Sequence, residues 1–277
     1  MKLLLQAISH CSDGMGVNRD AFVRLLHSAG ESVQAFVYPP HCLLCRTPLD
    51  ESNGLCPGCW ETLDMIKGPR CGRCGCPGLS DPCTNCADKD FVFSRMSALT
   101  PFSRSVQRMV HMLKYQGLTA AGQTLGRALG RMLERESLAE ARPVVVPVPL
   151  HGSRLRERGY NQSVLIARSL ARVLDLPVED RALKRVRATE TQTNLDSAQR
   201  GANMEGAFLV RRKDLVRGRP VLLVDDVVTT GATANACAAA LLEAGASEVD
   251  VAAVACPYFD AEKPDARTAV PDSALFI

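Results

Sequence analysis

PVLLVDDVVTTGATANACAAALL, from Pro220 to Leu242, is the stretch of the 277-residue chain that decides its fold. After a proline, four apolar residues lead into the acidic pair Asp225 and Asp226, and a turn rich in threonine and glycine precedes an alanine-rich run. A short apolar run of branched residues is typical of a strand buried on both faces, as in parallel sheets. The pattern therefore predicts a strand with an acidic tip, a small polar loop and a helix.

The loop after the two acids has the chemistry of an anion site. It supplies hydroxyls, backbone N–H groups at a helix start and a glycine without a Cβ, within Thr229, Thr230, Gly231, Ala232 and Thr233. Carboxylates repel phosphate but accept hydrogen bonds from hydroxyls, so a ligand with a 5′-phosphate and vicinal ribose hydroxyls satisfies both groups. Because adjacent residues of a strand point to opposite faces, we expect the acids to recognise hydroxyls rather than to share a proton.

The thirteen residues VLLVDDVVTTGAT, from Val221 to Thr233, resemble the phosphoribosyl pyrophosphate (PRPP) motif of the type I phosphoribosyltransferases. An apolar strand, an acidic pair and a small Thr/Gly phosphate loop follow one another, and all thirteen positions fit. The competing interpretation is an ordinary strand and helix joined by an exposed acidic turn.

The cysteines predict a metal-binding segment near the N-terminus. Ten of the twelve precede residue 90, and eight form four CxxC units. Two such units complete a tetrahedral site for Zn²⁺, so the pattern predicts two zinc ions on Cys42, Cys45, Cys56, Cys59, Cys71, Cys74, Cys83 and Cys86. Disulfides are the alternative, which a reducing compartment disfavours. The spacing leaves open which units share a metal, and Cys76 is a ninth sulfur without a role.

A second strand is predicted by PVVVPVP, Pro143 to Pro149, with Pro147 at a sheet edge or at the strand's exit. It continues into a polar, basic stretch that contains Leu150, His151, Gly152, Ser153, Arg154, Arg156 and Arg158. Guanidinium groups bind phosphate oxygens through paired hydrogen bonds, so a loop with several arginines at a strand end is a polyanion site. The alternative is the solvent face of a helix.

Apolar spacing predicts the remaining elements. They are a strand within Phe91–Thr100, a helix from Pro101 that closes with LKYQG at Gly117, a helix from Thr119 to Arg135, a helix through residues 164–171 and a strand over residues 248–255. Residues 181–219 have no sustained apolar period and contain ten Lys/Arg against four acids. A long polar, basic segment of this kind is either a functional flap or disorder, and its charge suits polyphosphate or nucleic acid.

Taken together, the chain resembles the ComF family, whose members are linked to natural competence and DNA uptake. The matching features cover residues 20–256: the zinc knuckles, LKYQG, VPVPL, RLRERGYNQS, the RxRxTxxQxxL pattern, RxxNMEGAF and the PRPP motif. The resemblance implies an α/β type I phosphoribosyltransferase fold, with a mainly parallel central sheet flanked by helices, preceded by a double zinc ribbon. It divides the chain into an unassigned extension (1–19), a packing helix with the ribbon (20–92), the phosphoribosyltransferase domain (93–260) and a tail (261–277).

The same resemblance implies roles for the candidate residues. Asp225 and Asp226 would hold the ribose hydroxyls, the loop Thr229 to Thr233 the 5′-phosphate, and Leu150 to Ser153 with Arg154 and Arg158 the pyrophosphate. A flexible flap would carry Arg185, Arg187, Thr189, Gln192 and Arg200. Mg²⁺ would stabilise charge on the leaving pyrophosphate, and no residue stands out as a base that activates an acceptor.

We therefore expect a PRPP-binding protein of DNA uptake, natural transformation or nucleotide metabolism, acting as a phosphoribosyltransferase with an unknown acceptor. The alternative is a non-catalytic module that senses PRPP or binds single-stranded DNA or a partner of the DNA-uptake machinery. An aromatic content of 5% offers few stacking platforms for a single strand. No apolar run approaches the ~18 residues of a membrane span, and the first residues lack a signal cleavage site, so we expect a cytoplasmic protein.

Overall fold

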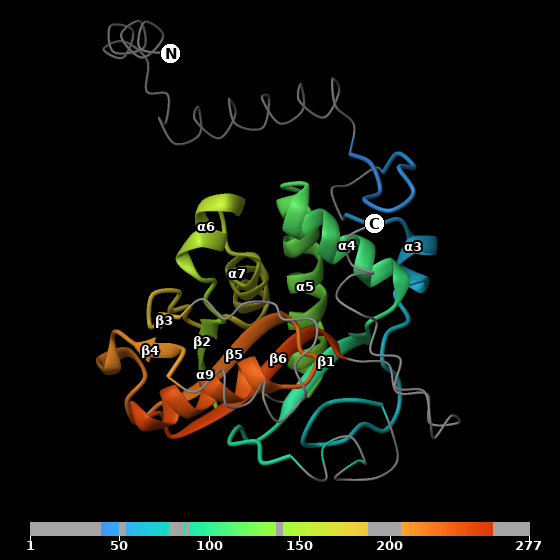
Figure 1. Cartoon of the computed structure of the whole chain (residues 1–277). Helices are drawn as coiled ribbons and strands as arrows, with labels where there is room; N and C mark the ends of the chain where they lie inside the picture. Colours follow the sequence, from blue (N-terminus) through green and yellow to red (C-terminus); the bar gives the residue numbers. More distant parts are fainter. Residues whose placement is uncertain are drawn as a thin grey trace, which may run out of the picture.

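The computed structural model describes residues 40–49, 54–77, 83, 86, 89–136, 141–187 and 206–256 (Figure 1). The predicted packing helix that begins at Asp20 and the predicted C-terminal tail lie outside these residues. None of the described helices is long and apolar enough to cross a membrane.

The centre of the molecule is a four-stranded parallel sheet with the strand order β1-β6-β5-β2. The strands are β1 (Met96–Pro101), β6 (Glu248–Cys256), β5 (Pro220–Val227) and β2 (Val144–Pro147). Almost every residue of these strands is buried, as the continuous apolar runs of the sequence predict. Pro147 is the last residue of an edge strand, where a missing N–H costs no ladder bond, and this prediction is confirmed.

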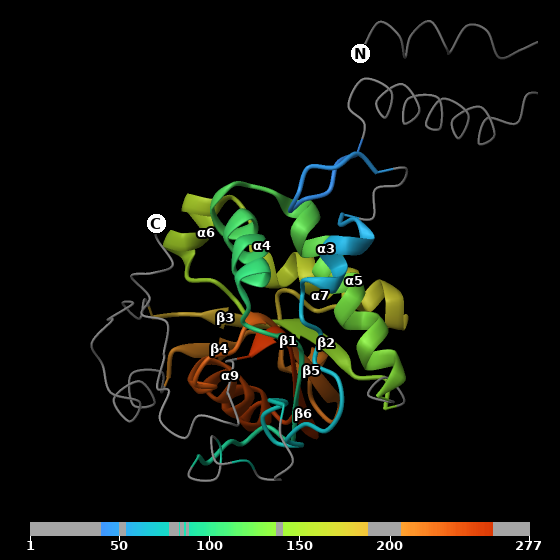
Figure 2. The same ribbon diagram turned by 90° about the vertical axis from the view of Figure 1, so that its right-hand side faces the viewer.

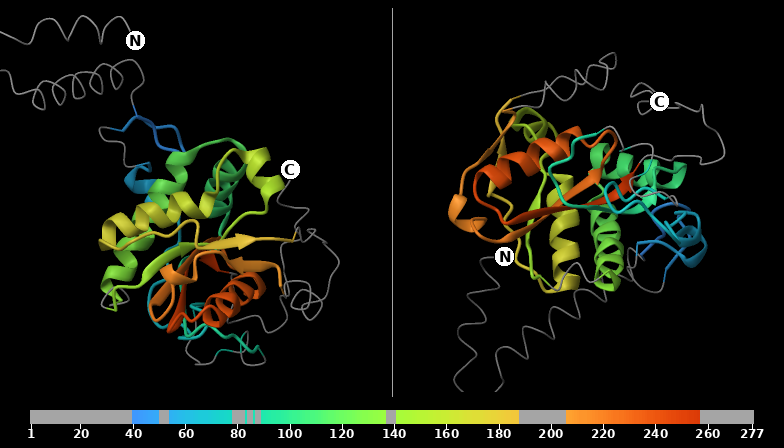
Figure 3. Two further views of the ribbon diagram at one scale, coloured as in Figure 1. Left: turned by 90° about the vertical axis from the view of Figure 1, so that its left-hand side faces the viewer. Right: turned by 90° about the horizontal axis from the view of Figure 1, so that it is seen from below.

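Helices cover both faces of the sheet (Figures 1 and 3). On one face lie α4 (Arg104–Tyr115), α5 (Thr119–Arg135) and α7 (Gln162–Leu174), and on the other lies α9 (Ala232–Glu243). The bounds of α5 agree with the prediction, because its apolar positions repeat without interruption. Gly126 allows α5 to approach α7 closely, since a Cβ there would lie 2.5 Å from the Ile166 carbonyl oxygen.

The alternation of side chains along β5 divides the apolar interior into two cores. Leu222 and Val224 pack with α4, α5 and α7, whereas Val221 and Leu223 pack with α9. We call these sides the α4 face and the α9 face of the sheet. Each face buries a separate cluster of side chains, so the sheet is covered on both sides as a parallel sheet requires.

The cysteine-rich segment is divided between the two faces. Its first part, with the short helix α3 (Pro57–Glu61), lies beside α4 and α5 (Figure 2), and Leu43 and Leu44 are buried in the core of the α4 face. Its second part packs into the core of the α9 face through Cys71, Cys74 and their neighbours. The chain between the two parts runs along the outer edge of β1, where the Ile66 N–H donates to the Leu99 carbonyl at 3.1 Å.

A small antiparallel pair stands apart from the main sheet. It is formed by β3 (Leu183–Arg185) and β4 (Phe208–Val210), with Arg185 opposite Phe208. The Val186 N–H donates to the Ala207 carbonyl at 2.8 Å. The segment predicted as the flap therefore leaves this pair and returns to it at adjacent positions. Between η1 (Lys213–Leu215) and β5 the chain turns back into the main sheet.

Candidate ligand site and metal centres

The two predicted ligand loops emerge at the same edge of the sheet. Strands β2 and β5 are parallel neighbours, and the Val148 N–H donates to the Val224 carbonyl at 2.9 Å. Consequently the residues after β2, from Leu150 onward, lie beside the acidic tip of β5 and the loop that follows it. Beyond the carboxyl ends of parallel strands is the usual ligand position in such sheets.

The arginines after β2 lie on a short helix and not on a loop, which is the alternative that the sequence left open. Helix α6 (Gly152–Arg158) begins after His151, whose ring nitrogen accepts from the Ser153 N–H. Arg154 is exposed and pairs with Glu157 at 3.0 Å. Arg158 instead turns toward α4, where its guanidinium lies 5.3 Å from the ring centre of Tyr115. Of the two arginines predicted to meet pyrophosphate, Arg158 is thus the one held against the rest of the domain.

Both acids of the motif lie on β5 and are buried, with Asp225 7% and Asp226 4% exposed. Asp226 forms an ion pair with Lys114 of α4, with the Nζ and a carboxylate oxygen 2.6 Å apart. The carboxylate of Asp225 accepts from the Ser163 hydroxyl at 3.0 Å and from the Asp226 backbone N–H at 2.8 Å. Both acids therefore have partners within the protein, although the buried Asp226 Oδ2 accepts no hydrogen bond and is held by the ion pair alone.

The surroundings drive the two acids to different protonation states. Burial, together with the charge of Asp226, raises the pKa of Asp225 to about 8. Burial also opposes ionisation of Asp226, but the positive charge of Lys114 outweighs it and lowers the pKa of Asp226. The pair thus holds one proton at neutral pH. Two carboxyl groups with divergent pKa values can act as a donor and an acceptor in the same site.

The predicted phosphate loop has the expected backbone geometry. Gly231 has a φ of +83°, which favours glycine, and α9 begins at the next residue. The Thr230 hydroxyl accepts from the Ala232 N–H at 3.4 Å, and Thr229 is exposed. The two threonines therefore lie just before the N-terminus of a twelve-residue helix, whose first N–H groups are suited to an anion.

The base of the predicted flap lies close to Asp225. Arg185 is at the end of β3, and its guanidinium lies 5.6 Å from the ring centre of Phe208. Burial lowers the pKa of Arg185. Arg187 is the last residue of the described segment, and the predicted flap residues Thr189, Gln192 and Arg200 lie outside it.

The eight cysteines of the CxxC units form two groups of consecutive units. The first group is Cys42, Cys45, Cys56 and Cys59, and the second is Cys71, Cys74, Cys83 and Cys86. Within each group all ligand atoms lie within 4.8 Å of one another. Cys45 and Cys56 are separated by 3.6 Å between sulfurs, and Cys74 and Cys83 by 3.4 Å. Four thiolates around Zn²⁺ at ~2.3 Å would be separated by roughly 3.8 Å, so both groups fit zinc.

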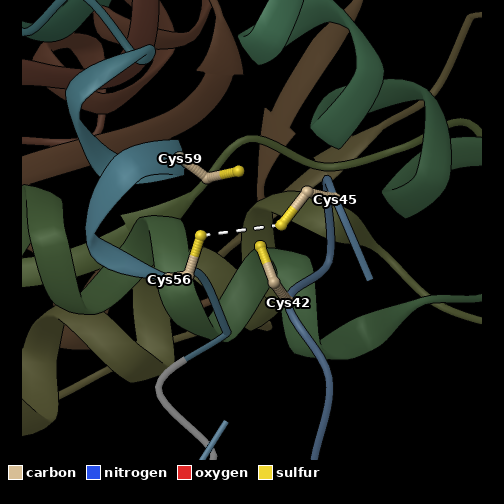
Figure 4. A group of neighbouring side chains, drawn as sticks. All are labelled: Cys42, Cys45, Cys56 and Cys59. Atoms are coloured by element: carbon tan, nitrogen blue, oxygen red, sulfur yellow. Dashed lines mark hydrogen bonds between the residues drawn. The ribbon is translucent and has the colours of Figure 1, made fainter. Parts of the chain in front are cut away.

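The first four-cysteine group is shown in Figure 4, where the four sulfurs converge on one point between a turn and the start of α3. Cys42 is buried, Cys45 is exposed, and the other two are half-buried. All four members of the second group are buried. The structure therefore answers the question that the spacing left open: consecutive units share a site.

Comparison with known proteins likewise separates the cysteine-rich part of the chain from the part that contains the sheet. The double zinc ribbon domain family matches residues 33–89, and the phosphoribosyl transferase domain family matches residues 160–274. Competence protein F of Haemophilus influenzae is 33% identical over 217 residues, which cover 76% of this chain and 94% of that protein. The chain belongs to the ComF family. DNA utilization protein YhgH of Escherichia coli is 34% identical over 77% of this chain and 95% of its own length.

The ComF assignment confirms the fold that the sequence predicted. The domain after the ribbon has the type I phosphoribosyltransferase fold, with a parallel sheet between helices. The cysteine-rich part is a double zinc ribbon whose two groups supply ligands for two zinc ions. Among solved structures, the allosteric regulatory enzyme of purine biosynthesis is 27% identical, with a TM-score of 0.33, over 47% of this chain and 25% of that chain.

Two of the ComF motifs meet around the acidic tip through residues for which the sequence analysis predicted no role. From LKYQG, Lys114 binds Asp226 and Tyr115 meets Arg158. From RGYNQS, the Tyr160 hydroxyl donates to the Leu113 carbonyl, and the Asn161 amide donates to the Val148 carbonyl at 2.9 Å. The motifs themselves were the available signal. Lys114 and Asp226 are 112 residues apart in the chain, so neither hydrophobic periodicity nor motif spacing could predict their contact.

Proposed function

We propose that this ComF-family protein binds PRPP together with Mg²⁺ at the shared edge of β2 and β5. The parallel pairing of these strands is the observation that carries the proposal, because it puts the acids, the phosphate loop and α6 at one sheet edge. In this arrangement the ribose hydroxyls meet Asp225 and Asp226, the 5′-phosphate meets the loop Thr229 to Thr233, and the pyrophosphate meets Leu150 to Ser153 with Arg154 and Arg158.

The ribose hydroxyls would reach Asp225 and Asp226 by replacing or sharing the present partners of these acids. Lys114 now neutralises Asp226, so a ribose hydroxyl that donates to Asp226 has to displace the ammonium or share the carboxylate with it. Asp225 holds a proton at neutral pH because its pKa is about 8. It can therefore donate to one ribose oxygen while it accepts from Ser163. Because the buried Asp226 Oδ2 accepts no hydrogen bond in the free protein, a ligand with well-placed hydroxyls is favoured at this site.

Phosphoribosyl transfer would proceed by departure of pyrophosphate from the anomeric carbon, through a state in which the ribose resembles an oxocarbenium ion. Mg²⁺ would supply charge neutralisation for the leaving pyrophosphate. Of the chain's own groups, Arg158 and the α6 region would stabilise charge on the leaving group, and the ionised Asp226 would stabilise positive charge on the ribose. The segment Arg185 to Arg200 is the one that we propose to exclude water from the site.

The names of the relatives indicate where this chemistry would be used. Because Competence protein F and DNA utilization protein YhgH match over most of the chain, we place the protein in DNA uptake or in the nucleotide metabolism linked to it. We expect it in the cytoplasm, where PRPP is available, with single-stranded DNA or the uptake machinery as the partner.

Calorimetric titration with PRPP and Mg²⁺ tests the ligand site. We expect the double variant Asp225→Asn/Asp226→Asn to bind PRPP about 100-fold more weakly, since two hydrogen bonds that involve carboxyl groups are changed at about 1.5 kcal/mol each. Asp214→Asn is a suitable control, because Asp214 is exposed and lies in η1, before the amino end of β5. PRPP affinity retained in the double variant would refute the assignment of the acids.

Release of pyrophosphate from PRPP, measured against a panel of nucleobases, then tests catalysis. Turnover with one base would identify the acceptor and the protein as a phosphoribosyltransferase. Tight binding without turnover would favour the non-catalytic alternative, a module that senses PRPP.

A further inference from the structure

The second four-cysteine group lies next to the loop that we propose to bind the 5′-phosphate. A small cavity is lined by Cys74 and Cys76 on one side and by Thr229, Thr230 and Gly231 on the other. Its volume of about 10 Å³ is that of roughly one water molecule. The metal ligand Cys74 and the phosphate loop thus border the same small cavity, whereas no ligand of the first group lines it.

The residues after the second group form a continuous connection between the metal site and the loop. The Lys89 N–H donates to the carbonyl of the metal ligand Cys86 at 3.2 Å, and the Phe91 N–H donates to the Lys89 carbonyl at 3.2 Å. Phe91 stacks on Phe93 with a centroid distance of 4.6 Å. A Cβ on Gly231 would lie 2.6 Å from the Phe91 ring. The ring therefore packs directly against the glycine that opens α9.

This connection is also fixed to α9. The Asn235 side chain accepts from the Val92 N–H at 2.7 Å and donates to the Asp90 carbonyl at 3.2 Å. Asn235 lies in the first turns of α9 and its own N–H donates to the Gly231 carbonyl at 2.8 Å. The chain on both sides of Phe91 is accordingly held to the helix whose N-terminus would receive the phosphate.

Two cationic side chains of the second ribbon, Lys89 and Arg73, lie near the Phe91 ring. The Lys89 Nζ and the Arg73 guanidinium each lie 6.0 Å from the centre of the Phe91 ring, and Lys89 lines the cavity with the threonines. Arg73 is between the ligands Cys71 and Cys74, and Lys89 follows Cys86. Their positions therefore depend on how the metal holds the two knuckles.

We propose that the second zinc ribbon forms one wall of the 5′-phosphate site, with Lys89 as a phosphate-binding residue and Phe91 as the residue that positions the loop. The proposal rests on the proposed function and adds that the two metal sites have different roles. The second metal supports binding of the phosphate, whereas the first does not. A cation placed beside helix N–H groups stabilises a doubly charged phosphate more than the N–H groups do alone.

The test compares Lys89→Gln with Lys67→Gln, an identical change at an exposed lysine between the ribbons. Calorimetry uses PRPP with Mg²⁺, ribose 5-phosphate and pyrophosphate as separate probes. We expect Lys89→Gln to weaken PRPP and ribose 5-phosphate by the same factor, about fivefold or more, and to leave pyrophosphate affinity unchanged. Lys67→Gln should bind all three probes as the unaltered protein does.

Substitution of one cysteine in each zinc site tests whether the second metal supports phosphate binding. Cys86→Ser is expected to lower zinc content from two to one and to weaken ribose 5-phosphate, whereas Cys45→Ser lowers zinc equally and leaves this affinity unchanged. Because Cys86→Ser also destabilises the α9 face, Phe91→Leu, which retains all the cysteines, is measured beside it and should weaken ribose 5-phosphate binding in the same way.

Equal affinities of Lys89→Gln and Lys67→Gln for ribose 5-phosphate would overturn the role of Lys89 while PRPP binding by the unaltered protein still stands. A loss of ribose 5-phosphate affinity in Cys45→Ser as large as in Cys86→Ser would overturn the division between the two metals. If the unaltered protein binds neither PRPP nor ribose 5-phosphate, the proposed function fails and this inference fails with it.

Discussion

The two faces of the sheet each carry one four-cysteine group and one acid of the motif, but they use them differently. On the α4 face the metal group is partly exposed and the acid, Asp226, has a cationic partner in Lys114. On the α9 face the metal group is wholly buried, and Asp225, which follows Val221 and Leu223 along this side of β5 but also accepts from Ser163 of α7, has its pKa raised to about 8. Identical ligands and neighbouring carboxyl groups thus acquire different properties from what is packed around them.

The difference in burial predicts that the two metals contribute unequally to stability. The second group belongs to the core of the α9 face, so Cys86→Ser should lower the free energy of unfolding by about 4 kcal/mol or more, since metal binding and folding are coupled there. Cys45→Ser should cost less than half as much, because Cys45 is exposed. Urea denaturation with parallel zinc analysis checks this. Equal losses in the two variants would remove the distinction between the faces.

The acid of the α9 face predicts a loss of stability with rising pH. The folded-state pKa of Asp225, about 8, lies above the unfolded value near 4. From about pH 4 to pH 8 the unfolded chain therefore releases a proton that the folded chain keeps. Stability should fall with pH in this window, by up to about 1.4 kcal/mol per unit, or roughly 3 kcal/mol between pH 5 and 7, and level off above pH 8.

Denaturation of Asp225→Asn across the same pH range isolates this group. The asparagine cannot ionise, so the decline should flatten, whereas Asp214→Asn should keep the slope of the unaltered protein. A slope that persists in Asp225→Asn would show that another group carries it.

Loss of Lys114, the partner of Asp226 on the α4 face, is expected to lower the free energy of unfolding by a smaller amount. Lys114→Met leaves the buried Asp226 carboxylate without a cation, at an expected cost of about 2 kcal/mol, reduced from the fully buried case because the lysine side chain is 24% exposed. Addition of Asp226→Leu should recover most of the loss, since the double variant leaves no unpaired charge. A double-mutant cycle in urea measures the coupling, and additive losses would contradict a direct ion pair.

The parts of the fold that follow from local pattern were predictable. The uninterrupted apolar repeat located α5 from Thr119 to Arg135, and the acidic pair after four apolar residues located the end of β5. Pro147 marked an edge strand because its ring removes a ladder donor. The presence of four CxxC units predicted two metal groups. Because the four units are equivalent in sequence, their spacing could not show which two units bind the same metal.

The parts that depend on distant contacts were not predictable. Nothing in the sequence around Asp226 indicates Lys114, and nothing around Gly231 indicates that Phe91 covers it, since both contacts arise only when the sheet is assembled. The arginines after β2 were expected on a loop because the expected helix lay further on, yet residues 152–158 also form a short helix that Gly159 ends with a φ of +77°. Local propensity could not decide between these outcomes.

The antiparallel pairing of β3 with β4 has a practical consequence for protein engineering. Since the hydrogen bond between Val186 and Ala207 holds the two ends of the intervening chain together, the number of residues between them is uncoupled from the register of the main sheet. Doubling that number would cost only about 0.6 kcal/mol of closure entropy. An insertion at this position is therefore expected to leave the sheet intact, so that any loss of PRPP binding would come from the proposed flap and not from the fold.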